Sequence, residues 1–312
     1  MDNRETIHVV VQGVGGPTRL DRFLRDRFPG WGRQAVGALV NARRVLVNGR
    51  VVWLASWLVE DGDRLEIRDP PRDKAPPPAV LDDAWIIAVE NDLIAVNKPA
   101  GVLSQRTRSR RPGDLLSLAC GRFGPLSLFH RLDRDTSGVV LLTRPGPINR
   151  YLDAAFKEGR VEKRYLAAVP ADNRLSAEGQ IALRLGPHDR RRDMMAVVER
   201  GGRRAVTRYR VLGEAEGVQL VLLCPQTGRT HQLRVHLTAM GAPILGDRLY
   251  GPHPPEARRL MLHARRIALP AADNFPARAY TAPVPEDLIG ELPRPLRALL
   301  PTLLDESNSP GC

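Results

Sequence analysis

The chain has 312 residues, and its 47 lysines and arginines outnumber its 35 aspartates and glutamates, which gives a formal net charge of +12 at pH 7. No apolar run approaches the ~20 residues that span a bilayer, and the N-terminal residues lead into no apolar signal core, so we exclude a membrane protein and disfavour a secreted one. The basic charge points instead to a polyanionic partner, most simply nucleic acid.

Cysteine usage is typical of a cytoplasmic protein. Cys120, Cys224 and Cys312 are far apart in the sequence and form no C-x-x-C pair. A sparse, odd-numbered set argues against a disulfide framework and against a cysteine-based zinc site. We therefore expect a reducing, cytoplasmic location.

A proline-rich segment divides the chain. Residues 69–83 contain prolines that neither continue a helix nor pair into a sheet, so we expect an extended linker there. This linker separates a small domain, residues 1–68, from a larger one, residues 84–300. Residues 301–312 are predicted to form a disordered tail.

The small domain shows a short α+β pattern. Apolar residues at helical spacing predict a helix over 20–28, and a second helical stretch covers 34–41. Two apolar runs then flank an Asn48-Gly49 turn, which is a strong hairpin signal. Residues 64–68 predict a further strand, so two helices lead into a small sheet.

The larger domain is dominated by strands. Apolar runs predict strands over 85–89, 93–96, 139–142, 165–169, 206–211 and 218–223, and helices over 115–120, 148–157 and 230–240. Strands outnumber helices and do not alternate with them one for one, which disfavours a Rossmann or TIM arrangement. We expect an α+β domain with a mixed, largely antiparallel sheet and flanking helices.

Three local patterns contain candidate functional residues. The first runs from His130 to Gly138 and sets Asp133 among arginines before Thr-Ser-Gly, which suits a loop that holds a carboxylate. On the residues alone, an ordinary salt-bridged loop is the favoured interpretation. The second pattern places Tyr165 at the start of a strand, where core packing is the plain interpretation.

The third pattern runs from Thr227 to Leu237, and G-D-x-x-Y-G follows it from residue 246. Thr230 is a candidate N-cap, and Leu233 and Leu237 are spaced to form a buried stripe. His231 and His236 are five residues apart and diverge on a helix, unlike the i, i+4 pair of a zinc site. We interpret both histidines as structural or RNA-facing and expect no metal.

Together these motifs resemble those of the RluA family of RNA pseudouridine synthases. The resemblance adds V-N-K-P-x-G at residues 96–101, K-x-Y at 163–165 and L-H-A at 262–264, all in the family's order. The small domain resembles an S4-type RNA-binding domain in its R-L-D opening at 19–21 and its V-x-V-N-G turn. The resemblance implies a pseudouridine synthase fold preceded by an S4-like domain.

The resemblance also implies roles for individual residues. Asp133 matches the essential carboxylate, Arg234 its basic partner, and Tyr165 the residue that stacks on the flipped base. Arg131 matches an arginine that fills the space the base leaves, and Leu262 is implied to line the uracil pocket. No cofactor and no metal are implied.

The expected activity is isomerisation of uridine to pseudouridine in structured RNA, with large-subunit ribosomal RNA favoured because of the S4-like domain. The alternatives are a tRNA pseudouridine synthase and a non-catalytic RNA-binding or ribosome-assembly factor on the same fold. We expect a monomer that binds neither membrane nor DNA. Three arginine-rich stretches, at residues 106–111, 190–192 and 203–204, are candidates for backbone contacts, with plain solvated surface as the alternative.

Overall fold

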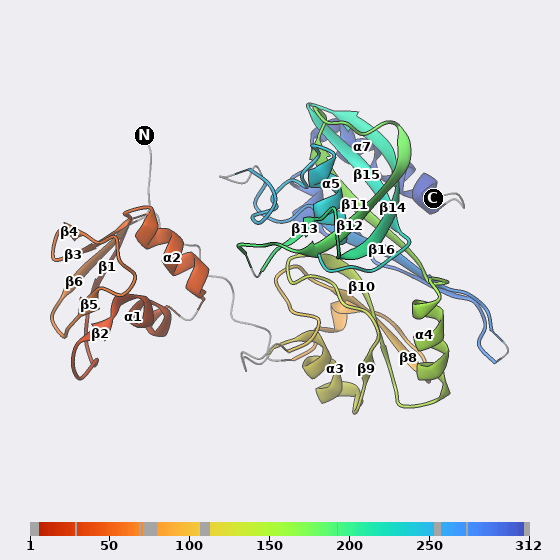
Figure 1. The fold of residues 1–312 in the computed structure, drawn as a ribbon. Coiled ribbons are helices and arrows are strands. Elements are labelled where there is room, and N and C mark those ends of the chain that lie inside the picture. Colours follow the sequence, from red (N-terminus) through yellow and green to blue (C-terminus); the bar gives the residue numbers. More distant parts are fainter. Residues whose placement is uncertain are drawn as a thin grey trace. The chain divides into compact units, whose positions relative to one another are not determined.

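The computed structural model divides into two compact units, Met1–Pro77 and Pro78–Cys312, which we describe separately (Figure 1). The structure describes residues 6–28, 30–68, 70, 80–106, 113–191, 193–252, 257–272 and 274–308. Within these ranges no helix is long and apolar enough to cross a membrane.

The first unit packs two helices on a small sheet. Its elements are β1 (Thr6–Val10), β2 (Thr18–Arg19), α1 (Leu20–Arg27), α2 (Arg33–Asn41), β3 (Val45–Val47), β4 (Arg50–Val51), β5 (Leu58–Val59) and β6 (Arg64–Arg68). The sheet order is β1-β6-β3-β4, and β2 pairs with β5. Asn48 and Gly49 both have positive φ, at 50° and 78°, as a two-residue hairpin turn requires. The predicted helices, hairpin and final strand are confirmed, whereas β1 was not predicted.

The second unit is built on one large sheet. Its strands are β7 (Ile86–Val89), β8 (Leu93–Lys98), β9 (Ser127–Leu128), β10 (Ser137–Thr143), β11 (Glu162–Pro170), β12 (Glu178–Pro187), β13 (Met195–Val197), β14 (Arg203–Ala215), β15 (Val218–Pro225), β16 (Leu262–Leu269) and β17 (Arg278–Thr281). Its helices are η1 (Asp83–Trp85), α3 (Leu115–Phe123), α4 (Pro147–Lys157), α5 (Gln232–Ala239), α6 (Glu286–Ile289) and α7 (Arg294–Asn308). The order is β13-β12-β14-β15-β11-β16-β10-β8-β7, with β17 on β16 and β9 on β10.

The sheet is largely antiparallel, as predicted. Among the strand pairs that the structure describes, only β10 and β16 run parallel. Figure 1 shows α3 and α4 on either side of β8 and β10. Alternate residues of these strands face the two helices: Leu93 and Leu141 pack with α4, while Ile94 and Leu142 pack with α3. Burial on both faces explains why β8 and β10 read as continuous apolar runs.

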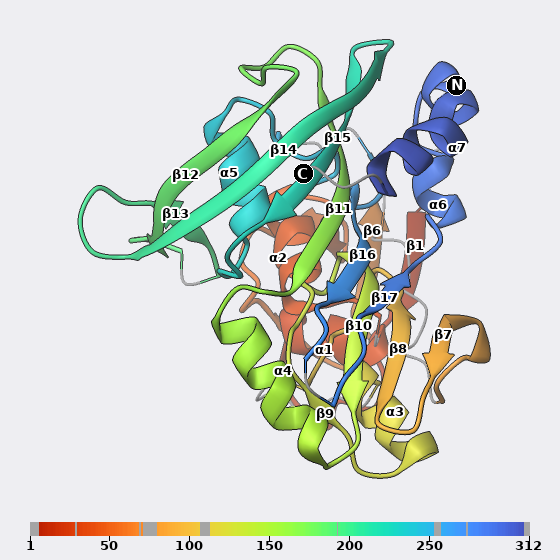
Figure 2. The same ribbon diagram turned by 90° about the vertical axis from the view of Figure 1, so that its right-hand side faces the viewer.

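The C-terminal end corrects the predicted tail. Helix α7 continues from residue 294 to 308 and contacts β14; Figure 2 shows it at one side of the large sheet. Leu296 and Leu300 are buried and Leu304 packs against the same core, so an i, i+4 stripe holds the helix. This packing outweighs the cost of Pro301 inside the helix, which is about 3 kcal/mol. Residues 309–312 lie outside the described ranges.

The predicted bounds of the linker also need correction. The predicted linker ran to residue 83, but Leu81 is buried in the cluster around α3, so the second unit begins before residue 84. Residues 71–79 lie outside the described ranges. Cys120 is a free thiol.

Candidate active site

The loop that contains Asp133 precedes the parallel contact between β10 and β16. Gly138 pairs with Ala264 across these strands and has φ of 120°. A Cβ at Gly138 would lie 2.2 Å from the carbonyl oxygen of Ala264, so only glycine permits this close approach. Ser137 Oγ is 2.9 Å from His263 Nδ1. The C-terminal end of the loop is therefore fixed to the sheet.

Two buried side chains hold the backbone on either side of Asp133. Ser104 Oγ donates to the carbonyl of Leu132 and accepts from its amide, at 2.9 and 3.0 Å. Lys98 Nζ donates to the carbonyl of Arg134 at 3.0 Å and to two further backbone carbonyls. Burial lowers the pKa of Lys98 to about 7, although Asp135 and Asp133 oppose this shift. The position of Asp133 is thus fixed by groups outside its own loop.

The carboxylate of Asp133 is contacted through one oxygen. Arg234 NH1 lies 3.4 Å from Oδ2, and His231 Nε2 lies 3.9 Å from the same oxygen. The side chain is 28% exposed. Within the described residues Oδ1 has no hydrogen-bond partner, so this oxygen is available to a substrate.

Arg234 is itself held by a second carboxylate. Its Nε and NH2 donate to the two oxygens of Asp247, both at 2.7 Å, in the bidentate geometry of a strong pair. Oδ1 of Asp247 also accepts the backbone amides of Leu249 and Tyr250. Burial alone would lower the pKa of Arg234, but bonding to Asp247 and the charges of Asp247 and Asp133 raise it overall. The guanidinium therefore stays charged.

Asp247 was not assigned a role from the sequence. Its signal was the G-D-x-x-Y-G motif, which belonged to the resemblance but carried no assigned function. In the structure, α5 supplies Arg234 and the segment after it supplies Asp247, so the two motifs form one buried pair.

Tyr165 borders the same region from the sheet. It lies in β11, where a register shift against β16 occurs between Arg164 and Tyr165, and its side chain packs against two apolar clusters. Burial raises the pKa of its hydroxyl, and the charge of Asp133 raises it further. The hydroxyl of Tyr165 is therefore within reach of the charge of Asp133.

The two remaining predicted residues are placed differently. Arg131 is exposed, two residues before Asp133, and has no ion pair within the described part of the chain. Leu262 is 3% exposed and packs in the cluster that Tyr165 borders. Of the arginine-rich stretches, 203–204 lies exposed in β14, whereas 107–111 and residue 192 are outside the described residues.

The start of α5 differs from the prediction. The N-cap is His231, not Thr230, and its backbone is left-handed with φ of 53°, a conformation that costs a non-glycine residue about 1–3 kcal/mol. The side chain of Gln232 accepts the amide of Arg229 at 3.0 Å, which ties the first turn of α5 to the residues before it. His236 points elsewhere, with Nδ1 3.0 Å from Thr207 Oγ1, so the two histidines diverge as predicted.

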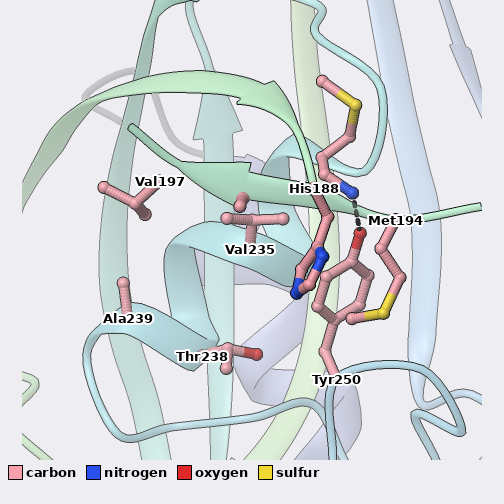
Figure 3. A pocket seen from close by; sticks show the side chains of 9 residues that line it. His188, Met194, Val197, Val235, Thr238, Ala239 and Tyr250 are labelled. Carbon is pink, nitrogen blue, oxygen red and sulfur yellow. Dashed lines mark hydrogen bonds between the residues drawn. The ribbon is translucent and has the colours of Figure 1, made fainter. Parts of the chain in front are cut away.

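Tyr250 also borders an apolar pocket (Figure 3). Its lining comes from α5, from the segment after α5, from the segment between β12 and β13, and from β13 itself: His188, Met194, Met195, Ala196, Val197, Val235, Thr238, Ala239 and Tyr250. The amide of Met195 donates to the hydroxyl of Tyr250 at 2.8 Å, shown as a dashed line in Figure 3. The guanidinium of Arg234 lies 5.0 Å from the centre of the Tyr250 ring.

The arrangement combines a carboxylate with a free oxygen, a charged guanidinium and an aromatic ring. No group of histidine, cysteine or acidic side chains among the described residues could hold a metal ion. Such a site suits chemistry at a sugar carbon beside a stacked base, because a carboxylate can attack or take a proton there while the ring binds the base face.

Comparison with known proteins agrees with this chemistry. The family described as RNA pseudouridylate synthase matches residues 92–239, and the S4 domain matches residues 18–65. An uncharacterized RNA pseudouridine synthase of Zymomonas mobilis is 39% identical over 64% of this chain and 94% of that protein. Ribosomal large subunit pseudouridine synthase D of Haemophilus ducreyi is 28% identical over 87% of this chain and 89% of that protein.

A solved structure supports the fold as well. Human RNA Pseudouridylate Synthase Domain Containing 1 is 27% identical, covers 74% of this chain and 99% of its own, and superposes with a TM-score of 0.56. Fold and site together define an RNA pseudouridine synthase, an isomerase preceded by an S4 domain. The chain belongs to the RluA family of these enzymes.

Proposed function

We propose that this protein converts uridine to pseudouridine in large-subunit ribosomal RNA, with Asp133 as the essential carboxylate. The observation that carries the proposal is the carboxylate itself: Arg234 contacts Oδ2, and Oδ1 is unbonded within the described residues. Tyr165 lies close enough for the charge of Asp133 to raise the pKa of its hydroxyl.

The reaction changes the uracil atom that is bonded to the ribose. The N1–C1′ bond breaks, the uracil turns while still bound, and C5 forms the new bond to C1′; C5 then loses its hydrogen and N1 gains one. Asp133 either attacks C1′ or takes the C2′ proton, and both routes need a free carboxylate oxygen. A glycosidase uses two carboxylates because it protonates a leaving group and activates water. Here the base stays and no water is consumed, so one carboxylate is sufficient.

The remaining site residues bind and shape the substrate. A uridine inside a helix is inaccessible, so the enzyme must flip it out at a cost of a few kcal/mol. Stacking on Tyr165 returns about 1–3 kcal/mol of that cost. Arg131, exposed two residues before Asp133, fills the space that the base leaves, and Leu262 lines the apolar side of the uracil pocket. Arg234 keeps Asp133 charged.

Ribosomal RNA is favoured over tRNA by the relatives and by the domain order. Several relatives over most of the chain are named ribosomal large subunit pseudouridine synthase D, and the S4 match precedes the catalytic match. We place the protein in the cytoplasm, where ribosomal RNA is made and assembled. All proposed site residues come from one chain, which supports a monomer.

The test follows the hydrogen that C5 must release. Large-subunit ribosomal RNA and a tRNA pool are transcribed with [5-³H]uridine, and tritium release is measured with wild type and with Asp133→Ala at concentrations where both bind RNA. We expect release from ribosomal RNA by wild type alone. Faster release from tRNA would overturn the substrate, and equal release by Asp133→Ala would overturn the role of Asp133.

A further inference from the structure

His231 is the one histidine next to the proposed reactive carboxylate in the described part of the chain, and the mechanism above does not use it. Its Nε2 lies 3.9 Å from Oδ2 of Asp133, while its Nδ1 lies 2.8 Å from the hydroxyl of Tyr250. Its backbone is left-handed, with φ of 53°. Strained backbone of this kind is found where surrounding structure imposes it, often at active sites.

The hydrogen-bond chain through Tyr250 fixes which nitrogen of His231 carries the proton. The backbone amide of Met195 can only donate, so it occupies one lone pair of the Tyr250 hydroxyl. Burial raises the pKa of Tyr250, so at neutral pH the hydroxyl keeps its own proton. The acceptor for that proton within the described residues is His231 Nδ1. In a neutral imidazole whose Nδ1 accepts, the proton lies on Nε2.

The charges around His231 agree with this tautomer. Burial lowers its pKa, with Arg234 acting in the same direction and Asp133, Asp247 and Asp193 in the opposite one, so the ring is neutral at pH 7. The opposite tautomer would aim the lone pair of Nε2 at an anionic oxygen and leave the Tyr250 proton without an acceptor in the described structure. Nε2–H facing Asp133 avoids both costs.

We propose that His231 is a positioning residue: its Nε2–H, fixed by Tyr250, holds Oδ2 of Asp133 together with Arg234, so that Oδ1 faces the ribose. This inference rests on the proposed role of Asp133. The separation of 3.9 Å is longer than a hydrogen bond, and catalytic hydrogen bonds often tighten only when substrate binds. Met195 begins β13, which lines the apolar pocket. The hydrogen bonds from Met195 through Tyr250 and His231 therefore link this strand to the carboxylate of Asp133.

The first test reads the tautomer directly and needs no activity. The full-length protein is labelled with ¹⁵N histidine, and long-range ¹H–¹⁵N correlations are recorded at pH 7.5. The His231 signals are assigned by their loss in His231→Gln, with His188→Gln as the matched control from the pocket wall. We expect a neutral ring protonated at Nε2 in wild type and a shift toward Nδ1–H in Tyr250→Phe. A wild-type ring that is charged, or protonated at Nδ1, overturns the proposal.

The second test compares two amides at position 231 by single-turnover tritium release. Gln places an N–H near the position of Nε2, whereas Asn tolerates the left-handed backbone but is too short to reach Asp133. We expect His231→Asn to slow the chemical step about 10- to 100-fold, as for a lost hydrogen bond to a charged group, with RNA affinity unchanged. His231→Gln should stay within about threefold of wild type. Equal rates in the two variants would overturn the proposal.

The third test asks whether Tyr250 acts through His231. Tyr250→Phe should slow the chemical step about 10-fold in the wild-type background and cause no further loss in His231→Gln, because Gln needs no tautomer control. Additive losses would show that Tyr250 has a separate role and would overturn the proposed hydrogen-bond chain from Tyr250 through His231 to Asp133. A wild type that releases no tritium refutes the proposed function instead, while the tautomer measurement still decides the hydrogen-bond chain.

Discussion

Arg234 joins two carboxylates whose surroundings differ. Asp247 is buried, receives two bonds of 2.7 Å from Arg234 and two more from backbone amides. Asp133 is 28% exposed and receives one contact of 3.4 Å from the same guanidinium. Strong bonds are concentrated on Asp247, the supporting carboxylate, whereas Asp133, the carboxylate that we propose to react, keeps one oxygen free within the described residues. The difference shows how a site can be held rigid without neutralising such a carboxylate.

The largest effect should come from the reactive side. Asp133→Asn keeps the shape of the side chain but removes its charge, so we expect tritium release to fall by about 10³-fold or more. The free energy of unfolding should change by less than about 1 kcal/mol, because the pair is partly exposed. Single-turnover assays and urea denaturation measure the two quantities. A loss of several kcal/mol of stability in Asp133→Asn would show that Asp133, like Asp247, stabilises the fold, and would contradict the proposed difference between the two carboxylates.

The supporting side should show the opposite balance. Asp247→Ala leaves Arg234 buried without its bidentate partner, so we expect the free energy of unfolding to fall by about 3–5 kcal/mol. Urea denaturation of this variant beside Asp133→Asn provides the matched comparison. A loss below about 1 kcal/mol would mean that Asp247 is not the anchor of Arg234.

Acid should lower the free energy of unfolding through His263, whose Nδ1 lies 2.9 Å from Ser137 Oγ at the end of the Asp133 loop. Burial lowers the pKa of this histidine to about 3, while its unfolded value is about 6.5. Between these values only the unfolded state takes up the proton, so stability is present above pH 6.5 and is lost as the pH falls toward 3. Between pH 7.5 and 5.0 wild type should lose up to about 2 kcal/mol more than His263→Gln. Identical pH profiles of urea denaturation would contradict this.

The smallest effect should come from Arg131. Its side chain is exposed and unpaired within the described residues, so Arg131→Ala should leave stability within about 0.5 kcal/mol of wild type. The Kd for RNA should rise about fivefold, because the flipped-out state loses the side chain that fills the space of the base. Arg131→Lys, which keeps the charge and most of the length, should recover part of this loss. A Kd unchanged by Arg131→Ala would show that the residue does not enter that space.

The sequence was informative where a residue's environment follows from its neighbours in the chain. Both-face burial makes β8 and β10 continuous apolar runs, and both were predicted. Strand β16 was missed because arginines 265 and 266 interrupt its apolar pattern. The tail was wrongly predicted because Pro301 outweighed a leucine stripe whose partners lie on distant strands.

The site followed the same rule. Motif order located Asp133, Tyr165 and Arg234, and the structure places all three together, although their roles stay proposals. Asp247 was missed because its function depends on a guanidinium that only the fold brings to it. The N-cap was misplaced because His231 adopts a left-handed backbone, which is uncommon for any residue other than glycine.

The hydrogen bonds from Lys98 and Ser104 determine at which stage the Asp133 loop loses its conformational entropy. Fixing the backbone of one residue costs about 1–2 kcal/mol, and both residues that flank Asp133 are fixed by side chains from earlier in the chain. The loop therefore loses this entropy during folding, before RNA binds. Binding energy from the RNA is then left for unstacking the uridine rather than for building the loop that receives it.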